Sequence, residues 1–258
     1  MTSENPIAKF FTGNISRKAM LTVLLPAVLI VLFSSLLISN LLFPTVYDWR
    51  FMVISALLDA GDNPLGQYFF SIGMTIAGFM MIPMLGYYNR KLGKICKGTT
   101  RVGTFFFLLG IIGLISVGTI GQVIHSIDKF HEILAGVGFI GLVFSAFFYG
   151  FSIMKDSSKG AKQFNMKLWM IIAVILWIPV IGMAGSAVYL EVVDTGLGWV
   201  SLDWITEGGS PLLSFALWEW VLFVAVIAYM ILLAVLVPQE ITPLVKEKRK
   251  VEAKKDGV

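Results

Sequence analysis

The chain has 258 residues, of which 57% are hydrophobic and 14% are charged, and its mean hydropathy is +0.84. A water-soluble domain usually carries about 45–50% apolar residues, so this composition excludes an ordinary soluble protein and indicates an integral membrane protein. The formal net charge of +4 does not indicate nucleic-acid binding, because membrane topology and anionic lipid headgroups account for the basic residues. We therefore expect membrane lipids as partners and no nucleic acid.

Six apolar stretches are long enough to cross a bilayer as helices, which takes about 20 residues each. They cover residues 20–43, 66–88, 102–124, 131–154, 168–189 and 211–237. The first is too long for a signal-peptide core, so we interpret it as a retained span. Trp169 and Tyr189 lie at the two ends of the fifth, where aromatic rings anchor helices at membrane interfaces. Ser210 and Pro211 predict the start of the sixth, as an N-cap hydroxyl followed by proline at the first helical position.

The basic residues predict how these helices are oriented. Eighteen of the twenty Lys and Arg residues fall in four clusters, and only Arg50 and Lys129 lie elsewhere. The clusters are Lys9, Arg17 and Lys18; Arg90, Lys91, Lys94, Lys97 and Arg101; Lys155, Lys159, Lys162 and Lys167; and Lys246, Lys248, Arg249, Lys250, Lys254 and Lys255. Short loops rich in Lys and Arg stay in the cytoplasm, so both termini are expected there. The sequence thus predicts an all-α protein of the plasma membrane, with one polytopic domain over residues 1–258 and a charged cytoplasmic tail at 238–258.

Two loops on the outer side are longer than a helical hairpin needs. They cover residues 44–65 and 191–210, mix apolar with acidic residues, and are expected to fold into a small cap. Alternating residues at 199–204 predict a short strand in the second loop. The cytoplasmic loops are short and basic, so we expect any ligand site on the outer side. One of them holds Cys96, the single cysteine, which excludes an intrachain disulfide. We interpret it as a reduced thiol, with acylation as the alternative.

Small residues recur along the predicted spans and favour close helix packing in lipid. The set comprises Gly73, Ala77, Gly110, Gly113, Gly118, Gly121, Gly141 and Ser145. In the fourth span His131, Ala135, Gly138 and Ser145 follow helical spacing and form one stripe. This stripe is expected to face another helix and to bring His131 into the bundle.

Glu219 is the residue that costs most to place in a membrane. If the sixth helix starts at Pro211, a rise of about 1.5 Å per residue puts this carboxyl roughly 12 Å from the outer end. An unpaired carboxylate at that depth costs several kcal/mol, so we expect it to be protonated, hydrogen-bonded or paired with a cation. His125 and His131 are the two histidines of the chain. An ion pair or shared proton between Glu219 and His131 is the expected arrangement.

Several short motifs together resemble the Frag/DRAM/Sfk superfamily of six-helix membrane proteins, over most of the chain. They are Ile54-Ser55-Ala56-Leu57, Asn63-Pro64, Phe69, residues 113–118, His131 with Ala135, and Glu219-Trp220. The resemblance implies a six-helix fold whose matching polar positions gather near the outer ends of the helices. Eukaryotic members are tied to lipid processing, lipid regulation or vesicle traffic, so it also implies an outward-facing site for a lipid headgroup. One departure is that Phe69 is followed by Phe70, where related sequences often have Asn.

Three classes of function remain open. In the first, the protein recognises or regulates lipids through an outward-facing polar site. That ligand-binding set is Asp59, Asn63, His125, His131, Glu219 and Trp220. In the second it is a lipid hydrolase or acyltransferase, with His131 as general base or metal ligand, Glu219 orienting it, and water or Ser55 as nucleophile. In the third it is a small-solute transporter with the ionisable Glu219 inside the membrane, although no repeated halves are visible.

A metal site is a further alternative within the loop between the third and fourth spans. His125, Asp128 and His131 lie close in sequence there and carry groups that bind zinc. Their spacing matches no established zinc motif, so we expect no cofactor and keep a divalent metal as the alternative. The sequence leaves open whether the protein has a protein partner or forms a homo-oligomer.

Overall fold

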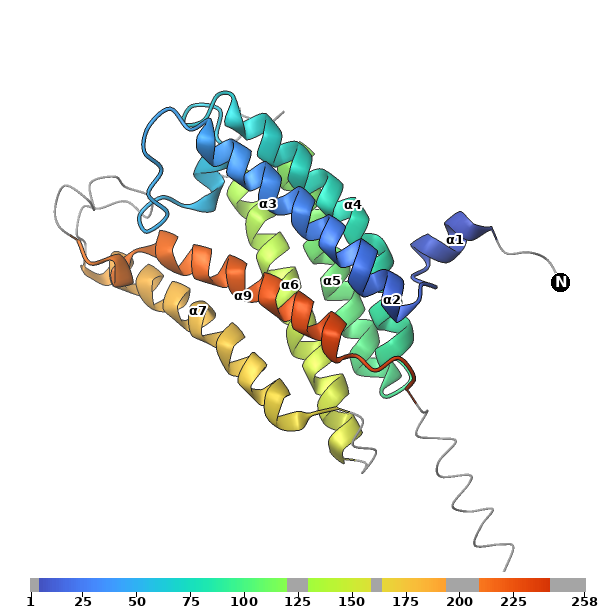
Figure 1. The fold of residues 1–258 in the computed structure, drawn as a ribbon. Helices are drawn as coiled ribbons and strands as arrows, with labels where there is room; N and C mark the ends of the chain where they lie inside the picture. Colours follow the sequence, from blue (N-terminus) through green and yellow to red (C-terminus); the bar gives the residue numbers. More distant parts are fainter. Residues whose placement is uncertain (1–4, 120–129, 159–163, 194–208, 242–258) are drawn as a thin grey trace, which may run out of the picture.

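The computed structural model describes residues 5–119, 130–158, 164–193 and 209–241. Within these residues the regular structure is helical, and six helices are long and apolar enough to cross a membrane (Figure 1). The candidate spans are Arg17–Leu41, Gly66–Leu92, Lys97–Thr119, Ile133–Lys155, Lys167–Leu190 and Phe215–Leu236. The predicted all-α fold with six transmembrane helices is therefore confirmed. The predicted strand at 199–204, residues 120–124 of the third span and most of the C-terminal tail lie outside the described residues.

The first span combines three kinds of helix. It begins with α2 (Arg17–Ala19), continues through the π-helical turn η1 (Met20–Leu24) and ends with α3 (Leu25–Leu41). Pro26 lies in the first turn of α3 and has no N–H to donate, and the wider π-turn just before it accommodates this missing bond. The remaining elements are α1 (Pro6–Phe11), η2 (Ile54–Leu58), α4 (Gly66–Leu92), α5 (Lys97–Thr119), α6 (Phe130–Ser158), α7 (Met166–Val193), η3 (Pro211–Leu213) and α9 (Phe215–Leu236).

The sixth transmembrane helix begins later than predicted. Pro211 starts the 3₁₀ turn η3, and Ser214 is extended, with φ −73° and ψ 129°, before α9 begins at Phe215. The prediction from Ser210 and Pro211 was wrong because a proline after a serine is equally compatible with a short 3₁₀ turn. As a result, Glu219 lies about one helical turn, roughly 6 Å, from the start of α9.

The helices pack in chain order from α3 to α6, and α7 pairs with α9 at the side of this group (Figure 1). Glycines bring α5 and α6 into backbone contact. A Cβ atom built on Gly113 would lie 2.4 Å from Cα of Gly138, and one built on Gly141 would lie 2.4 Å from the backbone nitrogen of Gly110. The predicted role of small residues in helix packing is confirmed at these positions, and the stripe through Gly138 does face another helix.

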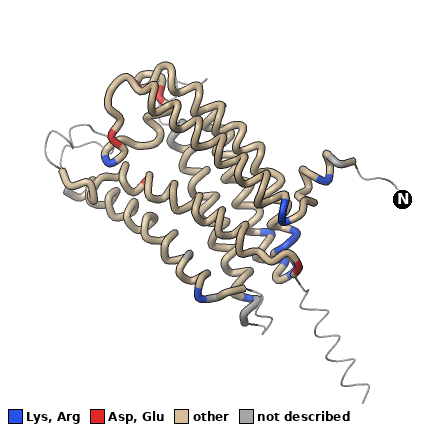
Figure 2. Tube along the Cα trace, in the orientation of Figure 1, with Lys and Arg blue, Asp and Glu red and all other residues tan. Residues whose placement is uncertain are grey.

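The charged residues divide the bundle into two ends. Figure 2 shows most of the described Lys and Arg residues at one end, which we call the basic end. The opposite end, called the loop end, carries residues 44–65, where Arg50 pairs with Asp48 at 2.6 Å. Arginine side chains at the basic end also join segments: Arg17 Nη2 donates to the carbonyl of Val235 at 2.5 Å, and Arg90 donates to the carbonyl of Gly13.

Trp169 occupies an unexpected environment. It lies in the first turn of α7, at the basic end, but its side chain is only 6% exposed and stacks on Tyr229 with ring centroids 5.6 Å apart. The prediction that this ring anchors the helix at the membrane interface was therefore wrong, because α9 covers it.

Candidate functional site

The loop over residues 44–65 is held on the bundle by Glu219. Oε2 of Glu219 accepts a hydrogen bond of 2.9 Å from the backbone N–H of Ile54, at the start of η2. Glu219 is 7% exposed, so the bond satisfies both a buried carboxyl oxygen and a buried amide. The expectation that Glu219 is hydrogen-bonded is confirmed, and among the described residues the donor is this amide.

Trp220 holds the same loop through a second contact. Its Nε1–H lies 3.1 Å from both the hydroxyl of Tyr47 and the carbonyl of Met52. The Tyr47 hydroxyl in turn lies 2.8 Å from the carbonyl of Val53. Burial raises the pKa of Tyr47 far above its ordinary value, so this hydroxyl remains protonated and donates. Glu219 and Trp220 are neighbours on α9, and they bind the backbone N–H of Ile54 and the backbone carbonyl of Met52.

Asn63 fixes the other end of the loop. Its side chain is fully buried, and Nδ2 donates to the carbonyl of Ser39 at 3.1 Å, to Ser39 Oγ at 2.9 Å and to the carbonyl of Leu57 at 3.2 Å. Its Oδ1 accepts from the N–H of Gly66, the first residue of α4. Asn63 therefore joins α3, η2 and α4 through one side chain.

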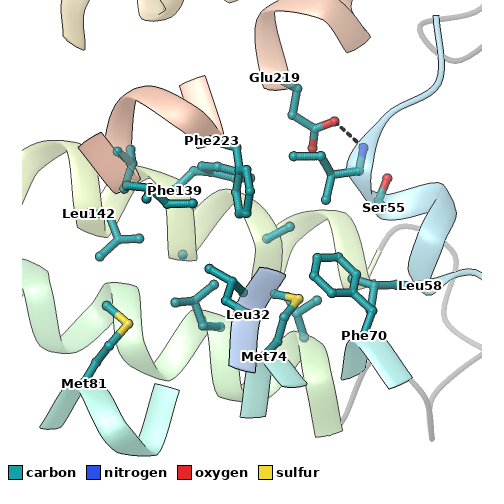
Figure 3. A pocket seen from close by; sticks show the side chains of 18 of the residues that line it. Leu32, Ser55, Leu58, Phe70, Met74, Met81, Phe139, Leu142, Glu219 and Phe223 are labelled. Carbon is teal, nitrogen blue, oxygen red and sulfur yellow. Dashed lines mark hydrogen bonds between the residues drawn. The ribbon is translucent and has the colours of Figure 1, made fainter. Parts of the chain in front are cut away.

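An elongated apolar cavity lies beneath this loop, among α3, α4, α5, α6, α9 and η2 (Figure 3). Its empty volume is about 830 Å³ with the open side included. Among the described residues that line it, Ser55 and Glu219 are the polar ones. On α9 the lining extends from Glu219 to Met230, about 16 Å along the helix axis. The geometry is a long apolar chamber with two polar side chains at the loop end.

The structure brings some of the predicted ligand-binding residues together and separates others. Glu219 and Ser55 share the cavity wall, whereas the groups of Asn63 and Trp220 bind other parts of the protein. Asp59 Oδ1 accepts from the N–H groups of Gly61 and Asp62 and so closes a turn in the loop. Burial, together with the Asp59 carboxylate, raises the pKa of Asp62.

The histidine side chains that were predicted to contact Glu219 or a metal lie outside the described residues. His131 lies in the first turn of α6, but its side chain, like His125 and Asp128 as a whole, lies outside the described residues. The pairing of His131 with Glu219 and the zinc alternative therefore stay predictions. In the part of the chain that the structure describes, no three His, Cys, Asp or Glu side chains form a group able to hold a metal ion.

The sequence matches the family model described as the Frag1/DRAM/Sfk1/Cwh43P N-terminal domain over residues 21–235. The chain belongs to this family. No curated protein and no solved structure matches it. The six candidate spans and the matched region together make this Frag1/DRAM/Sfk1/Cwh43P-family member a multi-pass membrane protein.

Sequence reasoning missed several residues that build the site in this family member. Ser39 and Tyr47 hold the loop through hydrogen bonds, but one lies in an apolar helix and the other in a loop with no motif around it. The apolar lining of the cavity was missed because its residues have the same composition as lipid-facing ones. The signal that did work was the cost of a carboxyl inside an apolar stretch, which identified Glu219.

Proposed function

We propose that the protein binds a membrane lipid in the cavity below the outer loop, with an acyl chain inside and the polar part of the lipid at Ser55 and Glu219. The observation that carries the proposal is the shape and polarity of the cavity. Its length of about 16 Å is close to half of a bilayer core of about 30 Å, which is the depth that one leaflet's chains occupy. Lipid-related roles of the eukaryotic family members support the same class of ligand.

A photo-crosslinking experiment tests this proposal. The full-length protein is reconstituted in nanodiscs that contain phosphatidylcholine with a diazirine in one acyl chain. We expect crosslinks to residues that line the cavity, such as Met74, Phe139 and Phe223. Ala135→Trp places a large side chain into the cavity, and the yield at these residues is expected to fall roughly tenfold. The yield is measured by peptide mass spectrometry.

The matched control is Ile140→Trp, on the same helix but at a position 56% exposed on the outer surface of the bundle. It should leave the cavity crosslinks unchanged. A second arm uses Glu219→Gln, which keeps an oxygen acceptor for the Ile54 amide while removing the ionisable group. Crosslinks that persist at full yield in Ala135→Trp would overturn the proposal, because the label would then report only the outer surface.

We further propose that the basic end faces the cytoplasm and that the protein resides in the cell membrane, because basic loops are retained on that side. Cys96 provides the test. Burial raises the pKa of its thiol, but hydrogen bonds from Thr99 and the Lys155 ammonium, 3.5 Å from Sγ, outweigh burial and bring the pKa to about 7. Because the thiolate fraction grows as the pH rises through 7, a maleimide should label Cys96 readily at pH 7.4.

A membrane-impermeant maleimide is therefore expected to label Cys96 only after the cells are permeabilised. The control carries Cys96→Ser and Val46→Cys. Val46 lies in the outer loop and is 91% exposed, so this variant should be labelled in intact cells. Labelling is read as a mass shift on a gel. The reverse pattern, with Cys96 labelled in intact cells and Val46→Cys protected, would show the opposite orientation.

A further inference from the structure

A second cavity lies at the other end of the molecule, between α6, α7 and α9. Its lining is apolar and aromatic, and its empty volume is about 620 Å³ with the open side included. The main lining residues are Phe147, Met154, Trp169, Leu176, Trp177 and Tyr229. It shares no lining residue with the cavity at Glu219, so the two sites are tested independently.

This cavity opens sideways, toward the surface that lipid covers. Phe147, Met154 and Trp177 are each about 40% exposed while they line it. Its depth matches one leaflet: Phe147 lies eight residues before Lys155 at the end of the fourth span, or about 12 Å along α6. Half of a bilayer core is about 15 Å. The cavity therefore belongs to the leaflet on the basic side.

The N–H of Trp169 is not available to an occupant of this cavity. Trp169 Nε1 has no surface that solvent can reach, so a ligand oxygen cannot reach it either. The Tyr229 hydroxyl donates to the carbonyl of Ala146 at 3.3 Å. The described lining is otherwise apolar and aromatic, so the part of a ligand that enters the cavity must be apolar, as an acyl chain is.

Positive charge lies at the mouth of the cavity. Lys155 follows Met154 on α6, and Lys167 precedes Trp169 by two residues on α7. Both lysines are exposed, and Lys155 lies 3.5 Å from Cys96 Sγ. Two residues of helix correspond to about 3 Å, so the apolar lining at Trp169 lies just deeper than Lys167. A phospholipid has the same order, because its charged phosphate lies outside its acyl chains.

We propose that this cavity binds an anionic phospholipid of the leaflet on the basic side. The acyl chain lies between α6, α7 and α9, and Lys155 and Lys167 bind the acidic headgroup. The protein would then bind a second lipid, which is anionic, at the end opposite to Glu219.

The test measures the lipids that remain bound to the full-length protein. The protein is extracted from nanodiscs that contain equal amounts of phosphatidylglycerol and phosphatidylcholine, and the bound lipids are counted by native mass spectrometry. We expect phosphatidylglycerol to be retained preferentially. Lys155→Gln combined with Lys167→Gln should lower the ratio of phosphatidylglycerol to phosphatidylcholine roughly 30-fold, or about fivefold for each lysine.

The control combines Lys18→Gln with Lys94→Gln. It removes the same charge from exposed positions at the basic end, outside the cavity lining, and should leave the lipid ratio unchanged. Equal losses in both double variants would overturn the proposal, since attraction would then depend on net charge alone. It would also be overturned by an unchanged ratio in the Lys155 and Lys167 variant, or by a dimer that carries no lipid, which would make a second copy the occupant.

Discussion

Gly141→Ala is expected to lower the free energy of unfolding by about 2 kcal/mol, although alanine is the better helix former. The Cβ atom would lie 2.4 Å from the backbone nitrogen of Gly110 and 2.8 Å from the carbonyl oxygen of Phe106. These are backbone atoms and cannot move aside as the end of a side chain does. The two helices must therefore separate locally and lose packing along their crossing. The apparent melting temperature in detergent, followed by size-exclusion chromatography after heating, should fall by about 5 °C.

Gly136→Ala provides the matched control in the same helix. A Cβ atom there has no atom within 4 Å, so only the gain in helix propensity remains. This variant should melt at the wild-type temperature or slightly above it. If both variants melt alike, the α5–α6 crossing is looser than the structure shows.

The transmembrane helices were largely predictable because hydropathy sums over about 20 residues and tolerates local error. The second span was predicted at residues 66–88 and extends over Gly66–Leu92, so its start agrees and its end differs by four residues. The start of the sixth span depended instead on two residues, Ser210 and Pro211, and was wrong by four. Signals that depend on one or two side chains fail where a short turn uses the same residues.

One residue of the candidate site, Glu219, was predictable from the sequence, but the arrangement of the site was not. Glu219 stood out because a carboxyl inside an apolar helix needs a partner. The partner that the structure describes is the N–H of Ile54, and a backbone amide carries no sequence signal. Asn63 and Trp220 were predicted to bind a ligand, but their described hydrogen bonds hold the loop over residues 44–65. Polar residues in a membrane protein can therefore hold the segments around a cavity together without lining the cavity themselves.

Asn63→Asp is expected to release the loop over residues 44–65, with a loss of about 3 kcal/mol in stability. The substitution keeps the shape and one oxygen for the Gly66 amide. It replaces the Nδ2 donor with an oxygen that faces the carbonyl of Ser39, its Oγ and the carbonyl of Leu57, at 2.9–3.2 Å. A buried carboxylate against carbonyl oxygens is repelled, and protonating it supplies one donor hydrogen where the amide supplied two.

Cleavage by trypsin at Arg50 reports the release, because this is the only Lys or Arg within residues 44–65. In the wild-type protein the backbone N–H groups of Phe51 and Met52 are bonded to the carbonyl of Asp48, so cleavage after Arg50 should be slow. The Asn63→Asp variant should be cut at least tenfold faster, which a 2 kcal/mol change in local opening already exceeds. Asn40→Asp is the control, since Asn40 is exposed near the end of α3. Slow cleavage in Asn63→Asp would mean that Glu219 and Trp220 hold the loop without Asn63.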